Sequence, residues 1–164
     1  MENNWIEALV MPSRTASKED PGHMVIGFNS PGDGEQHRGF RFSVDDLPKE
    51  FQTASRFRDY LFDHCVEGYV VDDINFARQC EKYGGLVVSR RWTIRHPETI
   101  KPLYPPQSRR EGWYSFNPDN FPDCHNCVTW AVAKINDAVD DSTLTRPTNG
   151  RIKHMLAILS DAHS

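Results

Sequence analysis

The chain has 164 residues, of which 38% are hydrophobic and 11% aromatic, and its formal net charge is −4. This length and composition favour one folded domain with a buried core over a disordered chain. Basic and acidic residues are mixed along the sequence, and no apolar run approaches the roughly 20 residues of a membrane-spanning helix. We therefore expect neither a nucleic-acid partner nor an integral membrane segment.

The N-terminus lacks the pattern of a signal peptide, because Glu2 is acidic and no basic residue followed by an apolar run comes after it. Four cysteines in a chain without such a signal favour free thiols in a reducing compartment over a disulfide framework. We expect a cytoplasmic protein, or one exported by a route that needs no signal peptide.

The first part of the chain predicts a β-hairpin. Residues 1–20 are mostly polar and predict a loose lead-in to a single domain over 21–164. The apolar run Gly22–Phe28 predicts a buried strand, which the turn residues Ser30–Gly34 end. Alternation from Gln36 to Ser43 predicts the antiparallel partner strand.

The rest of the chain alternates between helical and strand patterns. The spacing of apolar residues predicts strands at 69–72, 86–94 and 113–116, and helices over about 46–64, 74–83, 127–139 and 151–160. The stretch 95–124 is rich in Pro, Asn, Asp and Arg and predicts a long ordered loop around the third strand. These elements predict an α+β fold with a small antiparallel sheet packed against helices.

The segment Cys124–Ala131 carries the strongest chemical signal. Asn126 is a good helix cap, and Cys127 follows it at the start of an amphipathic helix. The unpaired N–H groups of a helix start favour the thiolate form of a cysteine placed there. Cys127 is therefore the candidate nucleophile.

A cysteine nucleophile needs a base and a polar group that orients the base. His23 opens the first predicted strand beside Gly22 and is the candidate base. His37, on the hairpin partner, is the candidate orienting residue, with Gln36 and Asn29 as alternatives. The hairpin register decides among them, and the sequence leaves it open.

Other functional classes stay open. Cys124 and Cys127 form a C-x-x-C motif, which is found in thiol–disulfide enzymes and in zinc sites. The 37 residues after Cys127 do not supply the further strands of a thioredoxin fold, and a second pair of zinc ligands is missing. A binding module without chemistry is the remaining alternative.

The run Gly22–Phe28, the Gly39-Phe40 strand and the downstream helix Asn126–Ala131 resemble the permuted papain-like, NlpC-type cysteine hydrolases, which include the lecithin:retinol acyltransferase-like enzymes and bacterial effectors. In that superfamily the histidine strand precedes the cysteine helix. The resemblance implies His23 and Cys127 as the catalytic pair and His37 as the third member. It leaves the stretch 45–121 without a matching motif.

The resemblance implies acyl transfer through a thioester, without a cofactor or metal, on a protein or peptide substrate. His23 would hold the thiolate and protonate the leaving group, while the backbone N–H of Cys127 holds the oxyanion. The expected substrate contacts are Trp113, Tyr114, Asn126 and Trp130. Lipid acyltransferase or phospholipase activity is the alternative within the superfamily, although the chain end shows no hydrophobic tail. Oxidation of Cys124 with Cys127 would give an inactive state.

Overall fold

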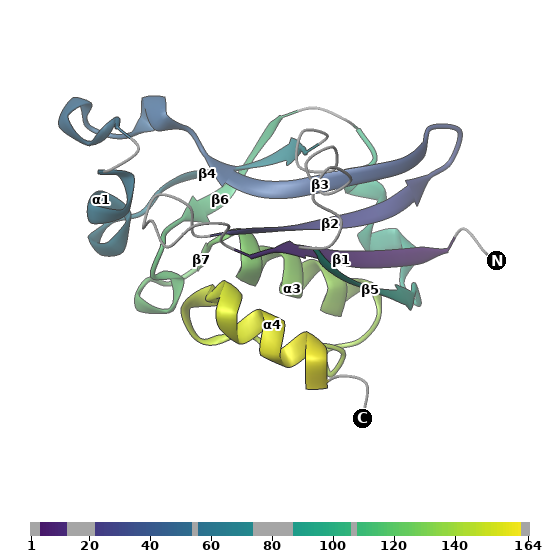
Figure 1. The fold of residues 1–164 in the computed structure, drawn as a ribbon. Helices are drawn as coiled ribbons and strands as arrows, with labels where there is room; N and C mark the ends of the chain where they lie inside the picture. The colour runs from purple at the N-terminus through teal and green to yellow at the C-terminus, as the bar shows by residue number, and fades with distance from the viewer. Residues whose placement is uncertain (1–3, 13–21, 54–55, 74–86, 106–107, 162–164) are drawn as a thin grey trace.

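The computed structural model describes residues 4–12, 22–53, 56–73, 87–105 and 108–161. Within them, a curled seven-stranded sheet has the order β5-β1-β2-β3-β4-β6-β7, and helices pack against it in a mixed α+β fold (Figure 1). The strands are β1 Trp5–Met11, β2 His23–Ser30, β3 Gly34–Phe42, β4 Val66–Asp72, β5 Val88–Thr93, β6 Arg109–Tyr114 and β7 Cys124–His125. The helices are α1 Phe57–Asp63, α3 Cys127–Ala138 and α4 Ile152–Asp161.

The predicted hairpin is confirmed. Strands β2 and β3 pair antiparallel, with Ser30 opposite Gly34 and Gly27 opposite His37. Strand β4 continues the sheet antiparallel to β3, and β6 pairs antiparallel with β4. Only β7 departs from this pattern among the described strands, because it pairs parallel to β6.

The expectation of a loose lead-in is wrong for Trp5–Met11. This segment forms β1, which lies inside the sheet between β2 and β5. Its residues from Ile6 to Met11 are buried, because helices cover one face of the strand and a smaller cluster with Val25 covers the other. A strand buried on both faces lacks the polar alternation that marks a half-exposed strand, so the sequence pattern missed it.

The helix α3 lies against the inner strands β1, β2 and β3, and α4 lies outside it on the same side of the sheet (Figure 1). Phe40 and Trp130 stack with ring centroids 5.8 Å apart, and this contact joins β3 to α3 at the centre of the core. The position of α3 relative to β2 is therefore fixed by large buried rings.

Two other expected elements differ from the observed ones. The long helix over 46–64 is reduced to α1, which is preceded by the short 3-10 turns Val44–Asp46 and Lys49–Phe51. The strand predicted at 113–116 begins earlier, at Arg109, and ends at Tyr114. The helix predicted over 74–83 lies outside the described residues.

Inside the stretch 95–124, the buried Arg38 of β3 holds the chain close to the sheet. Its Nε donates to the carbonyl of Leu103 at 2.9 Å, and its Nη2 donates to the carbonyl of Tyr104 at 2.9 Å. Two carbonyl groups of the loop are thus satisfied by one buried guanidinium. These bonds tie Leu103 and Tyr104 to β3.

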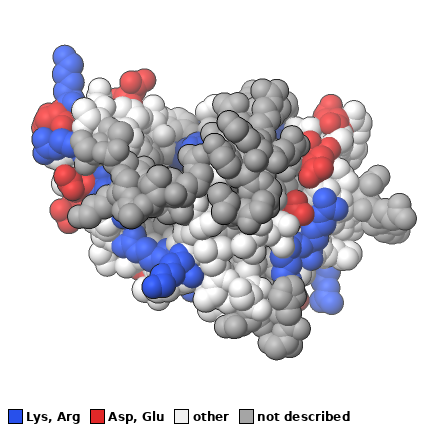
Figure 2. All heavy atoms as spheres, in the orientation of Figure 1, with Lys and Arg blue, Asp and Glu red and all other residues white. Residues whose placement is uncertain are grey.

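On the face shown in Figure 2, basic and acidic side chains of the described residues lie beside each other at both margins. Neither sign forms a continuous patch in that view. None of the described helices is long and apolar enough to cross a membrane.

Candidate active site

Cys127 is the first residue of α3, and Asn126 is its N-cap. The Asn126 Oδ1 accepts hydrogen bonds from the N–H groups of Val128 and Thr129, both at 3.0 Å. The Thr129 hydroxyl in turn accepts from the N–H of Asn126 at 3.0 Å, which completes a capping box. The helix start that carries the thiol is thereby held in one conformation.

The expectation that Asn126 contacts substrate does not fit its environment. The side chain is buried, and its Nδ2 donates to the carbonyl groups of Asn149 and Gly150, both at 3.1 Å. Gly150 has a positive φ of 58°, and a Cβ there would collide with the Asn126 amide. Asn126 therefore joins the start of α3 to the segment before α4.

Replacing Asn126 with alanine should lower the free energy of unfolding by about 2–4 kcal/mol. The variant loses a helix cap and leaves buried N–H and C=O groups without partners. Urea unfolding followed by circular dichroism measures the change. The exposed Asn120 offers a matched control, and Asn120→Ala should change the unfolding free energy by less than about 0.5 kcal/mol. Equal effects of the two substitutions would contradict this account of the cap.

His23, the first residue of β2, lies between the thiol and a carboxylate. Its Nε2 is 3.0 Å from Oδ2 of Asp73. The Cys127 thiol is in hydrogen-bonding contact with the His23 side chain and with the N–H of Met24. The structure thus brings the predicted pair His23 and Cys127 together and adds an acidic residue behind the histidine.

Asp73 directly follows β4 and is only 4% exposed. Its N–H donates to the carbonyl of His37 at 3.1 Å, which continues the pairing of β3 with β4. Its carboxylate accepts two hydrogen bonds from Arg41 of β3, from Nε to Oδ2 and from Nη2 to Oδ1, both at 2.9 Å. A bidentate guanidinium pair fixes the plane of the carboxylate that faces His23.

Gly39 of β3 leaves room for this carboxylate. A Cβ at Gly39 would overlap Oδ2 of Asp73 and would lie 3.2 Å from a methyl group of Val25. Any side chain at this position would displace the acid from the histidine. Glycine is therefore required at position 39 because the Asp73 carboxylate occupies the space of a side chain there.

Burial and nearby charges have opposing effects on the pKa values of Cys127 and His23. Burial alone would raise the pKa of Cys127, but the charge and hydrogen bond of His23 outweigh it, with help from the Met24 N–H and Arg41, and the pKa is lowered. Burial alone would lower the pKa of His23, but the Cys127 thiolate and the Asp73 carboxylate outweigh it and raise the pKa. Burial opposes ionisation of Asp73 as well, yet hydrogen bonds from His23 and Arg41 lower its pKa to about 2. These shifts favour a thiolate–imidazolium pair backed by a carboxylate.

Tyr114, the last residue of β6, also contacts the nucleophile residue. Its hydroxyl accepts a hydrogen bond from the N–H of Cys127. Burial and the nearby thiolate raise the pKa of Tyr114 well above its usual value, so the phenol keeps its proton. A backbone N–H and a phenolic O–H therefore lie together beside the sulfur.

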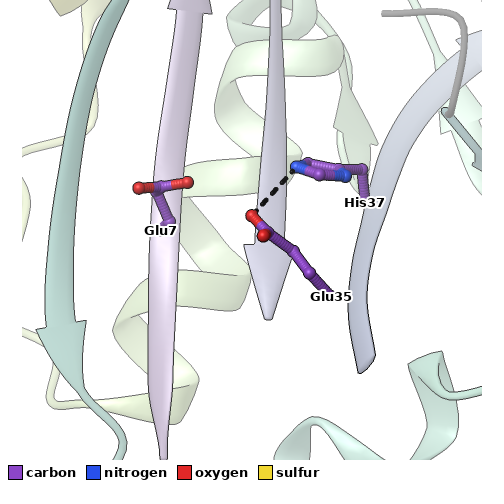
Figure 3. A group of neighbouring side chains, drawn as sticks. All are labelled: Glu7, Glu35 and His37. Atoms are coloured by element: carbon purple, nitrogen blue, oxygen red, sulfur yellow. Dashed lines mark ion pairs between the residues drawn. The ribbon is translucent and has the colours of Figure 1, made fainter. Parts of the chain in front are cut away.

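His37 does not orient His23. It lies opposite Gly27, four residues along β2 from His23, and packs over that glycine. Its Nε2 is 3.6 Å from Oε1 of Glu35, and the side chains of Glu7, Glu35 and His37 point toward one another from β1 and β3 across β2 (Figure 3). The hairpin register explains the correction, because it places His37 opposite Gly27, and the pairing of β4 with β3 brings Asp73 to the ring of His23.

The group in Figure 3 is the only set of three possible metal-ligating side chains close together in the described residues. Glu7 already forms an ion pair with Arg91, from Nε to Oε2 at 2.8 Å. His37 lies 3.6 Å from Glu35, so two of the three side chains contact other residues of the sheet. We assign no metal to this group.

The two tryptophans expected at the substrate differ in position. Trp130 is 2% exposed, stacks on Phe40 and donates from Nε1 to Glu111 at 2.9 Å. It belongs to the core and has almost no surface to offer a substrate, which corrects the expectation. Trp113 is 44% exposed on β6, next to Tyr114, and the guanidinium of Arg110 lies 5.7 Å from the centre of its ring.

Sequence reasoning missed Asp73 and Arg41, as well as the contact of Tyr114 with the nucleophile. The only local signal for the acid was its position directly after the predicted strand 69–72. Comparisons of the chain with known protein families, with curated proteins and with solved structures find no match. Support for a function therefore comes from the geometry of these side chains.

Proposed function

We propose that the protein is a cysteine-dependent hydrolase or acyl-transfer enzyme that acts on an amide or peptide bond. The observation that carries this proposal is the chain Cys127–His23–Asp73, with the thiol at a capped helix start and the acid held by Arg41. A purely structural cysteine needs neither a hydrogen-bonded histidine nor a lowered pKa. The function of a nucleophile accounts for all of these features together.

In the proposed reaction, the Cys127 thiolate attacks the carbonyl carbon of the substrate and forms a tetrahedral intermediate. Tyr114, whose hydroxyl oxygen accepts from the N–H of Cys127, donates its O–H to the developing oxyanion. The His23 imidazolium then protonates the leaving amine, and a thioester to Cys127 remains. Water or another acceptor, deprotonated by His23, releases the acyl group and regenerates the thiolate.

Asp73 has an orienting role in this scheme. Its contact with Nε2 of His23 leaves the other ring nitrogen, Nδ1, to exchange the proton with the thiol and the leaving group. The ionised carboxylate also stabilises the imidazolium. Arg41 keeps the carboxylate ionised and in place, so the orienting group is itself held by two hydrogen bonds.

The order of elements supports a relation to the permuted papain-like hydrolases. The histidine opens a strand that precedes the cysteine helix by about a hundred residues, as the resemblance implies. We propose Asp73 as the third catalytic member in place of His37. An acid in this position can orient the histidine as other polar groups do, because each accepts a hydrogen bond from the N–H of the far ring nitrogen.

Trapping of the thioester tests the proposal. In separate reactions, the protein is mixed with blocked peptide amides, a glutamine-containing peptide, phosphatidylcholine vesicles or a peptidyl acyloxymethyl ketone. Each reaction is quenched with acid and analysed by mass spectrometry of the intact protein and of its peptides. We expect an acyl or ketone adduct on Cys127, absent in Cys127→Ala and retained in Cys65→Ser. Acylation by the vesicles alone would replace the amide substrate by a lipid ester. No adduct at Cys127 with any reagent would overturn the proposed function.

A further inference from the structure

The mechanism above makes no use of two cysteines that lie in contact. The Sγ atoms of Cys65 and Cys124 are 3.1 Å apart, although 59 residues separate them in the sequence. Cys65 directly precedes β4, and Cys124 opens β7. Both of these strands pair with the end of β6, at Tyr114 and Trp113 respectively, and this arrangement brings the two thiols together.

We propose that Cys65 and Cys124 form a site of oxidative modification, at which a low-molecular-weight disulfide converts the two thiols into a cross-link. The contact distance is about one ångström longer than a disulfide bond, so a small adjustment of side chains suffices. All three cysteines in the described residues, these two and Cys127, are free thiols in the structure. The site is therefore in its reduced form.

The accessibility of the two thiols sets the order of the exchange. Cys65 is half-buried, whereas Cys124 is 3% exposed. Burial, followed by the hydrogen bond and charge of Cys65, raises the pKa of Cys124. Cys65 is thus the thiol that a reagent reaches, and Cys124 resolves the mixed disulfide.

In the first step, the Cys65 thiolate attacks one sulfur of oxidised glutathione, and one glutathione thiolate leaves. In the second step, Cys124 loses its proton and attacks the sulfur of Cys65, and the second glutathione thiolate leaves. The two protein thiols give up two electrons and two protons, and the reagent is reduced to two molecules of glutathione thiol. No other oxidant is needed.

This pairing changes the expected role of Cys124. The C-x-x-C spacing suggested a bond from Cys124 to Cys127, which would block the nucleophile. In the structure Cys124 contacts Cys65, while Cys127 contacts His23. Oxidation at Cys65 and Cys124 therefore leaves Cys127 free and joins the segment before Asp73 to the segment before α3.

Peptide mapping after redox equilibration tests the site without any reference to catalysis. The full chain is incubated with glutathione and its disulfide at several ratios, quenched with N-ethylmaleimide, digested and analysed by mass spectrometry. We expect a Cys65–Cys124 peptide pair with a loss of 2 Da, and Cys127 outside this cross-link, carrying maleimide or glutathione. The Cys127→Ala variant should form the same cross-link, so failure of the proposed function would leave this result unchanged.

Thermal unfolding gives the second readout. Closing a loop of about 59 residues should raise the melting temperature of the oxidised protein by about 10 °C, and Cys65→Ser should remove this shift. A Cys124–Cys127 cross-link as the main product in the wild type would overturn the proposal. So would a mixed disulfide on Cys65 that Cys124 never resolves, or a cross-linked protein that melts at the temperature of the reduced one.

Discussion

Cys127 is expected to react with iodoacetamide well below the pH of about 8.5 at which an ordinary thiol ionises. The lowered pKa of Cys127 gives more thiolate below pH 8.5 than an ordinary cysteine has, and the raised pKa of His23 keeps the imidazolium beside it until higher pH. His23→Ala removes the charge and the hydrogen bond that offset burial. Its alkylation rate at pH 6 should fall by about 10- to 100-fold, since one pKa unit changes the thiolate fraction about tenfold.

Cysteine-resolved mass spectrometry of alkylation rates between pH 4 and 10 measures this effect. His96→Ala is the matched control, because that histidine is exposed and pairs only with Glu98 in the described structure. The control should follow the wild-type curve. Equal alkylation profiles in His23→Ala and the wild type would remove the basis for a catalytic pair, even if Cys127 were reactive for another reason.

The second large effect is expected from Asp73→Asn. The substitution removes a carboxylate that helps to raise the pKa of His23, so the imidazolium should be lost at lower pH. The pH range in which Cys127 is a thiolate beside an imidazolium should therefore narrow from its alkaline side. We expect kcat/KM to fall on the order of 100-fold for a substrate that the trapping experiment identifies. His37→Ala is the comparison that decides between the two orienting candidates, and it should retain near-wild-type rates. The opposite ranking of the two variants would restore His37 and exclude Asp73.

The same variant should report on stability. The pKa of Asp73 is about 2 in the folded protein, below its unfolded value near 3.9, so its contribution is present above pH 4 and lost as the pH falls toward 2. Asp73→Asn should therefore lower the free energy of unfolding at pH 7 by about 2 kcal/mol and by much less near pH 2. Urea unfolding at the two pH values measures the difference.

Local signals predicted the helix half of the site. The sequence Asn126-Cys127 and the apolar spacing that follows it lie within one helical turn of each other, and the structure has the cap and the helix where the sequence predicted them. The strand that begins at His23 was predicted from its own apolar run in the same way. Because such features depend only on neighbouring residues, they can be predicted from the local sequence.

The missed parts depend on how distant strands pair. Asp73 reaches His23 only because β4 pairs with β3 in one register, and Tyr114 reaches Cys127 only through the pairing of β6 with β4. The pairing of β4 with β6 shifts in register between Glu67 and Tyr69, and no local sequence pattern predicts this shift. The choice of His37 followed from chain proximity, and the register separated it from His23 by four residues along β2.

The position of Asp73 after β4 also has a consequence for partly unfolded molecules. Asp73 lies 50 residues after His23 in the sequence and directly follows β4. Strand β4 must dock against β3 before the carboxylate of Asp73 can contact the His23 ring. A molecule in which β4 has detached keeps α3 and its thiol, but it loses the Asp73 carboxylate that stabilises the His23 imidazolium. Reactivity of Cys127 below pH 8.5 thus reports whether β4 is docked against β3, and it can be followed during refolding as a probe of that step.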